Sequence, residues 1–304
     1  MMRAVLERSL RTFAAPAEGA LRRTGLRAGV ALVYHRVGDP PGDPERELVP
    51  NHGTGLFEEQ LRYLGERYRL VAPSELVEAA AARRRRQPFP VAITFDDDLR
   101  GHRRVALPIL RRLGVPAAFF LCGASLDRPH AFWWERLQAV ADREGTRREV
   151  KAAAAAVEAL LPERLAEADS DLAERLGGDP PGAGMPAEDV EAVAGAGFEV
   201  GFHTLRHLRL TGLSDDPLGR ALTEGRERLE EVAGRPLRSI SYPHGKADAR
   251  VAAQARAAGF ALGFTGLPEA IRVGSDPLLL GRVEPSFRAT DELAVQLVRA
   301  LGRG

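Results

Sequence analysis

Seven short apolar runs recur along this chain of 304 residues, and each is followed by turn residues and then by a helical pattern. Strands that alternate with helices form a parallel sheet, which is either closed into a barrel or doubly wound. Barrels of about 200 to 300 residues routinely form one domain around a single core, so one barrel with an insertion accounts for the length. The runs span residues 30–34, 91–95, 117–121, 198–202, 239–242, 260–264 and 278–283.

Two segments depart from this alternating pattern. Residues 127–186 begin with aromatic residues, continue with an Ala, Glu and Arg-rich stretch and end rich in Gly and Pro, which predicts a helical insertion that either shapes a substrate cleft or forms a structural flap. Residues 1–27 carry six arginines but no continuous apolar core of a secretory signal. We expect a basic leader that either contacts an anionic membrane surface or forms a solvated capping helix. The barrel would then span residues 28–304.

The overall composition excludes several classes of protein. Lys plus Arg number 43 against 42 for Asp plus Glu, and aromatic residues are few, so we expect no nucleic-acid partner. Cys122 is the only cysteine, which excludes an internal disulfide and a cysteine-based zinc site. Since no run reaches the ~18 apolar residues of a spanning helix, we expect a cytoplasmic protein or one at the inner-membrane surface. The arginine run 83–86 would either bind phosphates or form a solvated helix end.

Polar residues follow four of the predicted strands at the point where each strand ends. His35 follows the first run, Asp96 and Asp97 close the second, His203 follows the fourth, and residues 243–245 follow the fifth. In a parallel α/β barrel the carboxyl ends of the strands meet at one rim, where the working residues lie. Core packing alone does not require this convergence, so the sequence predicts a functional site at that rim.

Two histidines and a carboxylate are the ligand set of a catalytic zinc site, which leaves a fourth position for water. His203 and His207 are four apart, a spacing that predicts one face of a helical turn. Asp96 and Asp97 would point to opposite faces of a regular strand, so both reach the site only if the strand ends there. One carboxylate could then bind the metal while the other acts on the water.

Other interpretations of these residues remain at this point. The same ligand types also hold Fe(II) in oxygenases, although the carboxylate here comes first and from another strand. Three further histidines, His52, His102 and His130, lie in predicted loops or helix starts without partners, and we assign them no role.

At this point the chain resembles the polysaccharide deacetylases, the NodB-like carbohydrate esterases. Residues 94–97 (Thr-Phe-Asp-Asp) resemble the family's first motif, residues 203–207 (His-Thr-Leu-Arg-His) its second, and residues 242–245 (Tyr-Pro-His-Gly) its third. The resemblance implies a distorted (β/α)7 barrel and a divalent metal, usually zinc, with cobalt or nickel as alternatives. It implies the following site residues: Asp97, His203 and His207 on the metal, Asp96 as general base, the Tyr242 backbone N–H on the oxyanion, and Pro243 and Gly245 in the loop that lines the substrate groove.

The chain departs from the family pattern in three places. Asp98 stands where the first motif has glycine, and Ser241 stands where the third motif has an arginine that orients the base. No histidine follows His244, so the usual general acid is absent from its place. Tyr34-His35 resembles a rearranged motif of a subset of the family, which makes His35 our candidate for the general acid.

The activity implied by this resemblance is metal-dependent hydrolysis of the N-acetyl amide of an amino sugar, within a polysaccharide or a lipid-linked glycan. The partner would be an N-acetylated glycan. Two alternatives stay open: another C–N hydrolase on the same barrel that acts on a small amide, and a catalytically impaired relative that only binds glycan.

Overall fold

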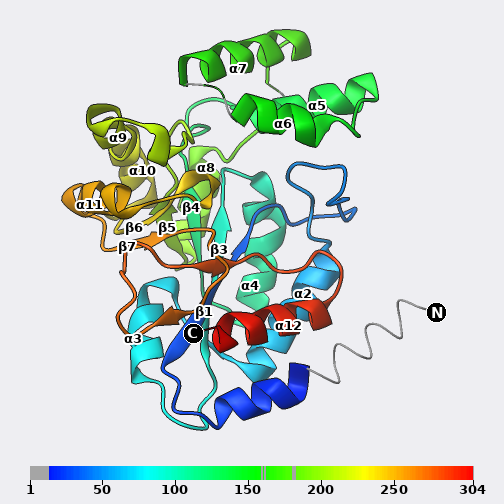
Figure 1. The fold of residues 1–304 in the computed structure, drawn as a ribbon. Coiled ribbons are helices and arrows are strands. Elements are labelled where there is room, and N and C mark those ends of the chain that lie inside the picture. Colours follow the sequence, from blue (N-terminus) through cyan, green and yellow to red (C-terminus); the bar gives the residue numbers. More distant parts are fainter. Residues whose placement is uncertain (1–13, 159, 161, 180–182, 304) are drawn as a thin grey trace.

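Parallel strands form a nearly closed barrel in the computed structural model, which describes residues 14–158, 160, 162–179 and 183–303 (Figure 1). Neighbouring strands of the barrel follow chain order and pair in parallel. β9 (Arg282–Val283) pairs with β1, and Leu280 bridges Phe264 of β7, so this last segment fills the gap between the first and the sixth strand. The predicted seven-stranded barrel is confirmed. The six other strands are β1 (Ala28–Tyr34), β3 (Pro90–Asp96), β4 (Ala117–Leu121), β5 (Glu199–Phe202), β6 (Ser239–Ser241) and β7 (Leu262–Phe264).

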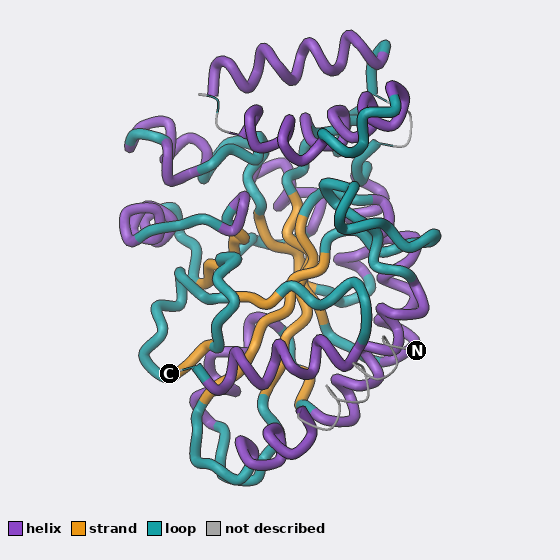
Figure 2. Tube along the Cα trace, turned by 45° about the vertical axis from the view of Figure 1, so that its right-hand side comes forward, coloured by secondary structure: helices purple, strands orange, loops and turns teal. Residues whose placement is uncertain are grey.

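Helices surround these strands on the outside, as Figure 2 shows. All residues of β1, β3 and β4 are buried, which explains why their sequences are apolar almost throughout rather than alternating. The aromatic residues Phe57, Phe95 and Phe119 belong to the main core, which lies between strands and helices. The surrounding helices are α2 (Thr54–Arg67), α3 (Leu76–Ala82), α4 (Leu107–Leu113), α8 (Ala187–Gly195), α9 (Asp215–Ala221), α10 (Arg226–Ala233), α11 (Ala249–Ala257) and α12 (Thr290–Gly302).

Some elements differ from the sequence pattern. The helical pattern over residues 215–232 is divided into α9 and α10, because Gly225 adopts a left-handed φ of 76° between them. Two short strands were not predicted: β2 (Arg69–Leu70) pairs with β3, and β8 (Ile271–Arg272) runs antiparallel to β1. A π-helical turn, His102–Ala106, precedes α4.

Of the described helices between β4 and β5, three lie within the predicted insertion. They are α5 (Trp133–Glu144), α6 (Val150–Glu158) and α7 (Pro162–Leu176), and they lie above the carboxyl ends of the strands (Figure 1). Trp133, Trp134 and Leu172 pack in a second, smaller core that includes Cys122 of the barrel. Because this core joins the insertion to the barrel, the helices are fixed over the strand ends.

The opposite end of the barrel carries the chain's first described residues. Residues 14–22 are helical and lie below the strands in Figure 1, and Leu21 packs against the main core. The first 13 residues of the predicted leader lie outside the described residues. Among the described helices, none is long and apolar enough to cross a membrane.

Candidate metal centre and active site

The two neighbouring aspartates lie where β3 ends. Asp96 is the last residue of the strand, and Asp97 adopts a left-handed φ of 74° directly after it. This turn removes the alternation that would place their side chains on opposite faces, as the sequence predicted. Both carboxylates are buried, with 3% and 4% of their surface exposed.

The two histidines of the second motif meet through a tight turn and not through a helix. His203 follows β5, and the chain then turns through Thr204 and His207, whose φ angles are 61° and 47°. The His207 N–H donates to the Thr204 carbonyl at 3.2 Å. The predicted helical turn is therefore wrong, although its consequence holds, because the imidazole rings lie 4.8 Å apart.

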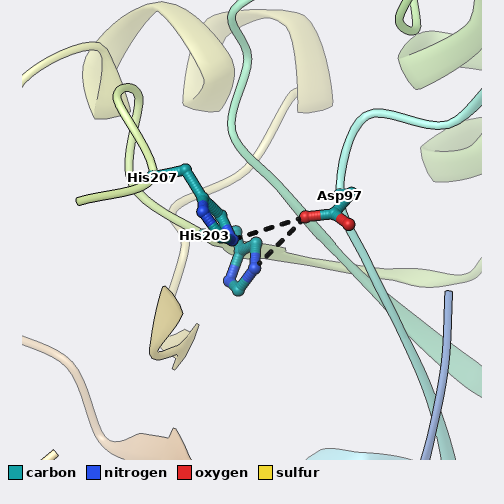
Figure 3. Close-up of side chains that lie close together, drawn as sticks. All are labelled: Asp97, His203 and His207. Carbon is teal, nitrogen blue, oxygen red and sulfur yellow. Dashed lines mark ion pairs between the residues drawn. The ribbon is translucent and has the colours of Figure 1, made fainter. Parts of the chain in front are cut away.

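Asp97, His203 and His207 converge on one point (Figure 3). The Asp97 Oδ1 atom lies 3.5 Å from His203 Nε2 and 3.6 Å from His207 Nε2. Two ligands at ~2.1 Å from a tetrahedral ion are ~3.4 Å apart, so these separations fit a zinc-sized cation. Moreover, Asp97 Oδ1 is buried and has no hydrogen-bond partner. The residues present fit a divalent metal.

The environment of His203 orients its metal-facing nitrogen. Its Nδ1 lies 2.8 Å from the Ser241 carbonyl oxygen, which can only accept a hydrogen bond. Nδ1 therefore carries the proton, and Nε2 presents a lone pair toward Asp97. A backbone carbonyl that accepts this proton orients a metal-binding imidazole and makes its other nitrogen a better ligand.

Arg282 holds the general-base candidate, and the sequence did not identify it. Its Nη1 and Nη2 donate to Asp96 Oδ1 and Oδ2 at 2.7 and 2.6 Å, a bidentate pair. The Ser241 hydroxyl lies 2.8 Å from Asp96 Oδ2. The expectation that the base lacks an orienting arginine is thus wrong, because β9 supplies one. The only sequence signal was an arginine after the apolar run 278–280.

These contacts also set the charges of the two aspartates. Burial raises the pKa of Asp96, but the Arg282 guanidinium and His203 outweigh it and hold that pKa below its usual value. Burial likewise raises the pKa of Asp97, and the adjacent imidazoles of His203 and His207 reverse the shift. Both side chains are therefore carboxylates at neutral pH.

Asp98 turns away from this cluster and anchors a neighbouring loop. Its Oδ1 accepts hydrogen bonds from the N–H groups of Cys122 and Gly123 at 2.8 and 3.2 Å, and its Oδ2 accepts one from Ala124 at 2.9 Å. Burial raises the pKa of Asp98 to about 6, although the three N–H groups oppose this shift. The aspartate in the glycine position thus ties the end of β3 to the loop after β4.

The third motif has a structural role and does not present the predicted oxyanion donor to the site. The Tyr242 N–H donates to the Phe264 carbonyl at 3.0 Å, so it is already used between β6 and β7. This contradicts the role expected for it on the oxyanion. Pro243 is buried. Gly245 has a φ of 65°, and a Cβ added to it would come within 2.7 Å of the Gly266 backbone. Only glycine fits there.

The remaining histidines divide into pocket-lining and structural residues. His35 lines the site, with Nδ1 3.7 Å from Glu284 Oε1. His52 and His102, expected to lack partners, are buried and bond the carbonyls of Pro285 and His35 at 3.1 and 3.0 Å. That expectation was wrong because both partners are distant in sequence.

A pocket of about 380 Å³ opens onto the cluster. Trp133 and Trp134 of α5 and Glu158 of α6 contribute to its wall. Glu158 Oε1 lies 3.3 Å from His244 Nδ1 and 2.5 Å from an Arg209 nitrogen, so a contact with His244 and an ion pair with Arg209 join the insertion to the site loops. The insertion therefore shapes the cleft.

Comparison with known proteins identifies the family of this chain. The sequence profile described as polysaccharide deacetylase matches residues 83–263, which is more than half of the chain. The chain belongs to the polysaccharide deacetylase family. The family match spans the first two motifs and residues 242–245, but Arg282 lies beyond it.

Relatives of the family are similar to this chain at low identity. The Bacillus subtilis (strain 168) protein YxkH, which carries the family's name, is 20% identical over 258 residues, covering 84% of this chain and 70% of the relative. The Streptococcus pyogenes deacetylase PplD, solved in complex with acetate, has a TM-score of 0.63 at 17% identity over 91% of this chain and 99% of its own. IcaB from Ammonifex degensii has a TM-score of 0.60 at 20% identity over 91% and 97%. These structures share the fold.

Proposed function

We propose that this protein is a metal-dependent deacetylase that hydrolyses the N-acetyl amide of an amino sugar in a glycan. The observation that supports the proposal is the buried trio of Asp97, His203 and His207 beside Asp96 in one pocket. Two imidazoles and a carboxylate hold zinc in hydrolytic sites and leave one coordination position free. We expect zinc, with cobalt or nickel as alternatives.

The side chains around the trio have separate tasks in this proposal. A divalent cation held there would polarise the acetyl carbonyl and lower the pKa of the attacking water. Asp96 is the proton acceptor for that water, since its Oδ2 lies 3.9 Å from His203 Nε2, at the edge of the trio. Arg282 and Ser241 fix the direction of its carboxylate, which matters because a general base works only within ~3 Å of its proton.

We assign His35 to the protonation of the leaving amine. It follows β1, lines the same pocket as Asp96, and comes from the opposite side of β3 to His203. The carboxylate of Glu284 lies 3.7 Å from its Nδ1. Among the described histidines outside the ligand pair, His35 and His244 line this pocket, and His244 is held by Glu158.

The covered pocket limits how much glycan can be bound. Its volume of about 380 Å³ is near the lower end of the ~300–1,000 Å³ of small-molecule sites. We therefore expect one or two sugar rings to be enclosed, with the rest of a polysaccharide or lipid-linked glycan outside. Trp133 and Trp134 offer apolar ring surface to such a sugar.

Acetate release from a panel of N-acetylated glycans of increasing length tests the proposal. The protein is first stripped by a chelator, and zinc, cobalt or nickel is then returned. Asp97→Ala and His203→Ala should lose bound metal and acetate release together, while Asp127→Ala, an exposed aspartate paired with Arg228, should keep both. Full activity of either ligand variant after chelation would contradict the mechanism.

The same assay separates the alternatives. Turnover of small cyclic amides or ureides without turnover of glycans would favour a different C–N hydrolase. Glycan binding without acetate release would favour a relative that has lost catalysis. Ser241 in the place of the motif's arginine does not support this alternative, because Arg282 orients Asp96 instead. Iron content with oxygen-dependent turnover would favour an oxygenase.

A further inference from the structure

Five exposed arginines gather at the amino-terminal end of the barrel, opposite the metal centre. Two of them precede β1 and three follow α3, so segments about sixty residues apart contribute to one surface. In Figure 1 this end lies at the bottom and the insertion over the site lies at the top. We call these residues the arginine patch: Arg23, Arg27, Arg84, Arg85 and Arg86.

A buried arginine holds the two segments of the patch together. Arg83 donates from Nη2 to the Arg22 carbonyl at 3.0 Å and from Nη1 to the Leu26 carbonyl at 2.5 Å, and its guanidinium lies 3.6 Å from the centre of the Phe89 ring. The Arg86 N–H also donates to the Arg22 carbonyl, at 2.7 Å. These bonds fix where the exposed arginines stand, so the patch is a built surface.

The charges of the patch have no acidic partners among the described residues. Arg85 and Arg27 donate from Nε to the carbonyls of Arg23 and Ala81, which leaves their positive charge uncompensated. Some exposed arginines elsewhere on the surface are paired, as Arg112 is with Glu58 at 2.8 Å. With a chain charge of only +1, five unpaired cations on one face are a local concentration of positive potential.

The chemistry of the patch fits an anionic lipid surface better than a nucleic acid. β8 runs antiparallel to β1 with Arg272 opposite Ala28, so Val273, the residue after β8, lies near Arg27, the residue before β1. Val273 is 57% exposed and is one of three large apolar side chains exposed among the described residues. An apolar side chain within a basic cluster suits a headgroup boundary. Single-stranded nucleic acid would need exposed aromatic rings, and none of the exposed apolar side chains is aromatic.

We propose that the arginine patch docks this protein on an anionic phospholipid surface, with the metal centre turned away from the bilayer. β1 joins the two ends, because Arg27 directly precedes it and His35 directly follows it. Seven extended residues span about 20 Å, so the site would face glycan held at least that far above the headgroups. This inference does not depend on the proposed deacetylation.

Co-sedimentation of the full chain with vesicles tests the docking. Vesicles of 30% phosphatidylglycerol in phosphatidylcholine should bind the protein, and pure phosphatidylcholine vesicles should not. The triple variant Arg23→Gln, Arg84→Gln, Arg86→Gln should bind at least about tenfold more weakly. The matched control Arg103→Gln, Arg104→Gln, Arg111→Gln removes three arginines beside and on α4, away from the patch, and should change binding less than twofold. Equal loss in both variants would overturn the proposal.

The orientation has its own readout, which needs no enzymatic assay. The only two tryptophans, Trp133 and Trp134, lie at the site end. Brominated lipids quench tryptophan at short range, so protein bound through the patch should keep its fluorescence. Quenching on binding would place the site against the bilayer and overturn the stated orientation. A duplex or single-stranded oligonucleotide that binds more tightly than the vesicles, and loses binding in the patch variant, would overturn the choice of lipid.

Discussion

The two ends of this barrel treat ionisable side chains in opposite ways. At the carboxyl ends of the strands, five ionisable residues of the candidate metal centre are each at most 8% exposed. They are Asp96, Asp97, His203, His207 and Arg282. At the amino-terminal end, the arginine patch is exposed and has no acidic partner among the described residues. The same fold therefore carries one set of buried charges at the metal centre and one set of hydrated charges in the arginine patch.

This difference determines what each set can do. A charge removed from water loses several kcal/mol of hydration free energy, so a buried side chain stays charged only beside specific partners. Removing one partner leaves the other buried and unpaired. A hydrated charge contributes little to stability and acts at long range on a binding partner. We therefore expect substitutions near the centre to change folding strongly, and substitutions in the patch to change only binding.

The largest effect is expected when the Arg282–Asp96 pair is broken. Arg282→Met should lower the free energy of unfolding by about 3 to 5 kcal/mol, because it leaves the Asp96 carboxylate buried without its bidentate partner. Urea denaturation measures the change. The matched control is Arg288→Met, whose exposed pair with Glu45 at 3.2 Å should contribute less than about 1 kcal/mol. Equal losses in the two variants would remove the contrast between the ends.

Asp98 should affect folding without affecting the metal. Asp98→Asn replaces one accepting oxygen by an amide nitrogen, which leaves one of the Cys122, Gly123 and Ala124 N–H contacts unmade. We expect a loss of about 2 kcal/mol in unfolding free energy and unchanged zinc content by elemental analysis. Loss of zinc at unchanged stability would instead make Asp98 part of the metal centre. Asp127→Asn serves as the exposed control.

Buried His52 should make stability depend on pH. Burial lowers its pKa to about 4, against the hydrogen bonds to the carbonyls of Ser286 and Pro285. The unfolded chain then binds a proton on His52 near pH 6.5, whereas the folded chain binds it only near pH 4. The contribution of His52 to the free energy of unfolding is therefore complete above about pH 6.5 and is lost as the pH falls to about 4. From pH 7.5 to 5 the contribution is about 2 kcal/mol.

Urea denaturation at pH 7.5 and at pH 5 measures this contribution to the free energy of unfolding. In His52→Gln, which keeps a side-chain N–H for Pro285, the loss between pH 7.5 and 5 should shrink by about that amount. An unchanged pH dependence would show that His52 is hydrated or charged in the folded protein. His102, whose pKa burial also lowers to about 4, remains in place and continues to contribute.

The smallest effect on stability is expected at the other end. The patch variant Arg23→Gln, Arg84→Gln, Arg86→Gln should unfold within about 0.5 kcal/mol of the parent, because these side chains are exposed and lack acidic partners among the described residues. A much larger loss would show that the patch, like Arg83, serves folding. Arg83→Gln should be clearly more destabilising, since that side chain is 4% exposed and donates to four backbone carbonyls.

Much of the candidate site could be predicted because local patterns encode strand ends. The apolar runs place Asp96, Asp97 and His203 directly after strands, and parallel strands bring those positions to one rim. The turn that joins His203 to His207 was missed, because two non-glycine residues adopt left-handed φ angles that no local pattern indicates.

By itself, the sequence determined the barrel, the strand ends at which the candidate metal ligands lie and the location of the helical insertion, because hydrophobic periodicity and motif spacing are local properties of the chain. Only the tertiary structure decided the partners. Arg282 reaches Asp96 across 186 positions, and Asp98 bonds a loop 24 to 26 positions away. Phe264 takes the Tyr242 N–H, and two distant segments form the arginine patch. Such pairings depend on which strands become neighbours, and burial then makes each pairing obligatory.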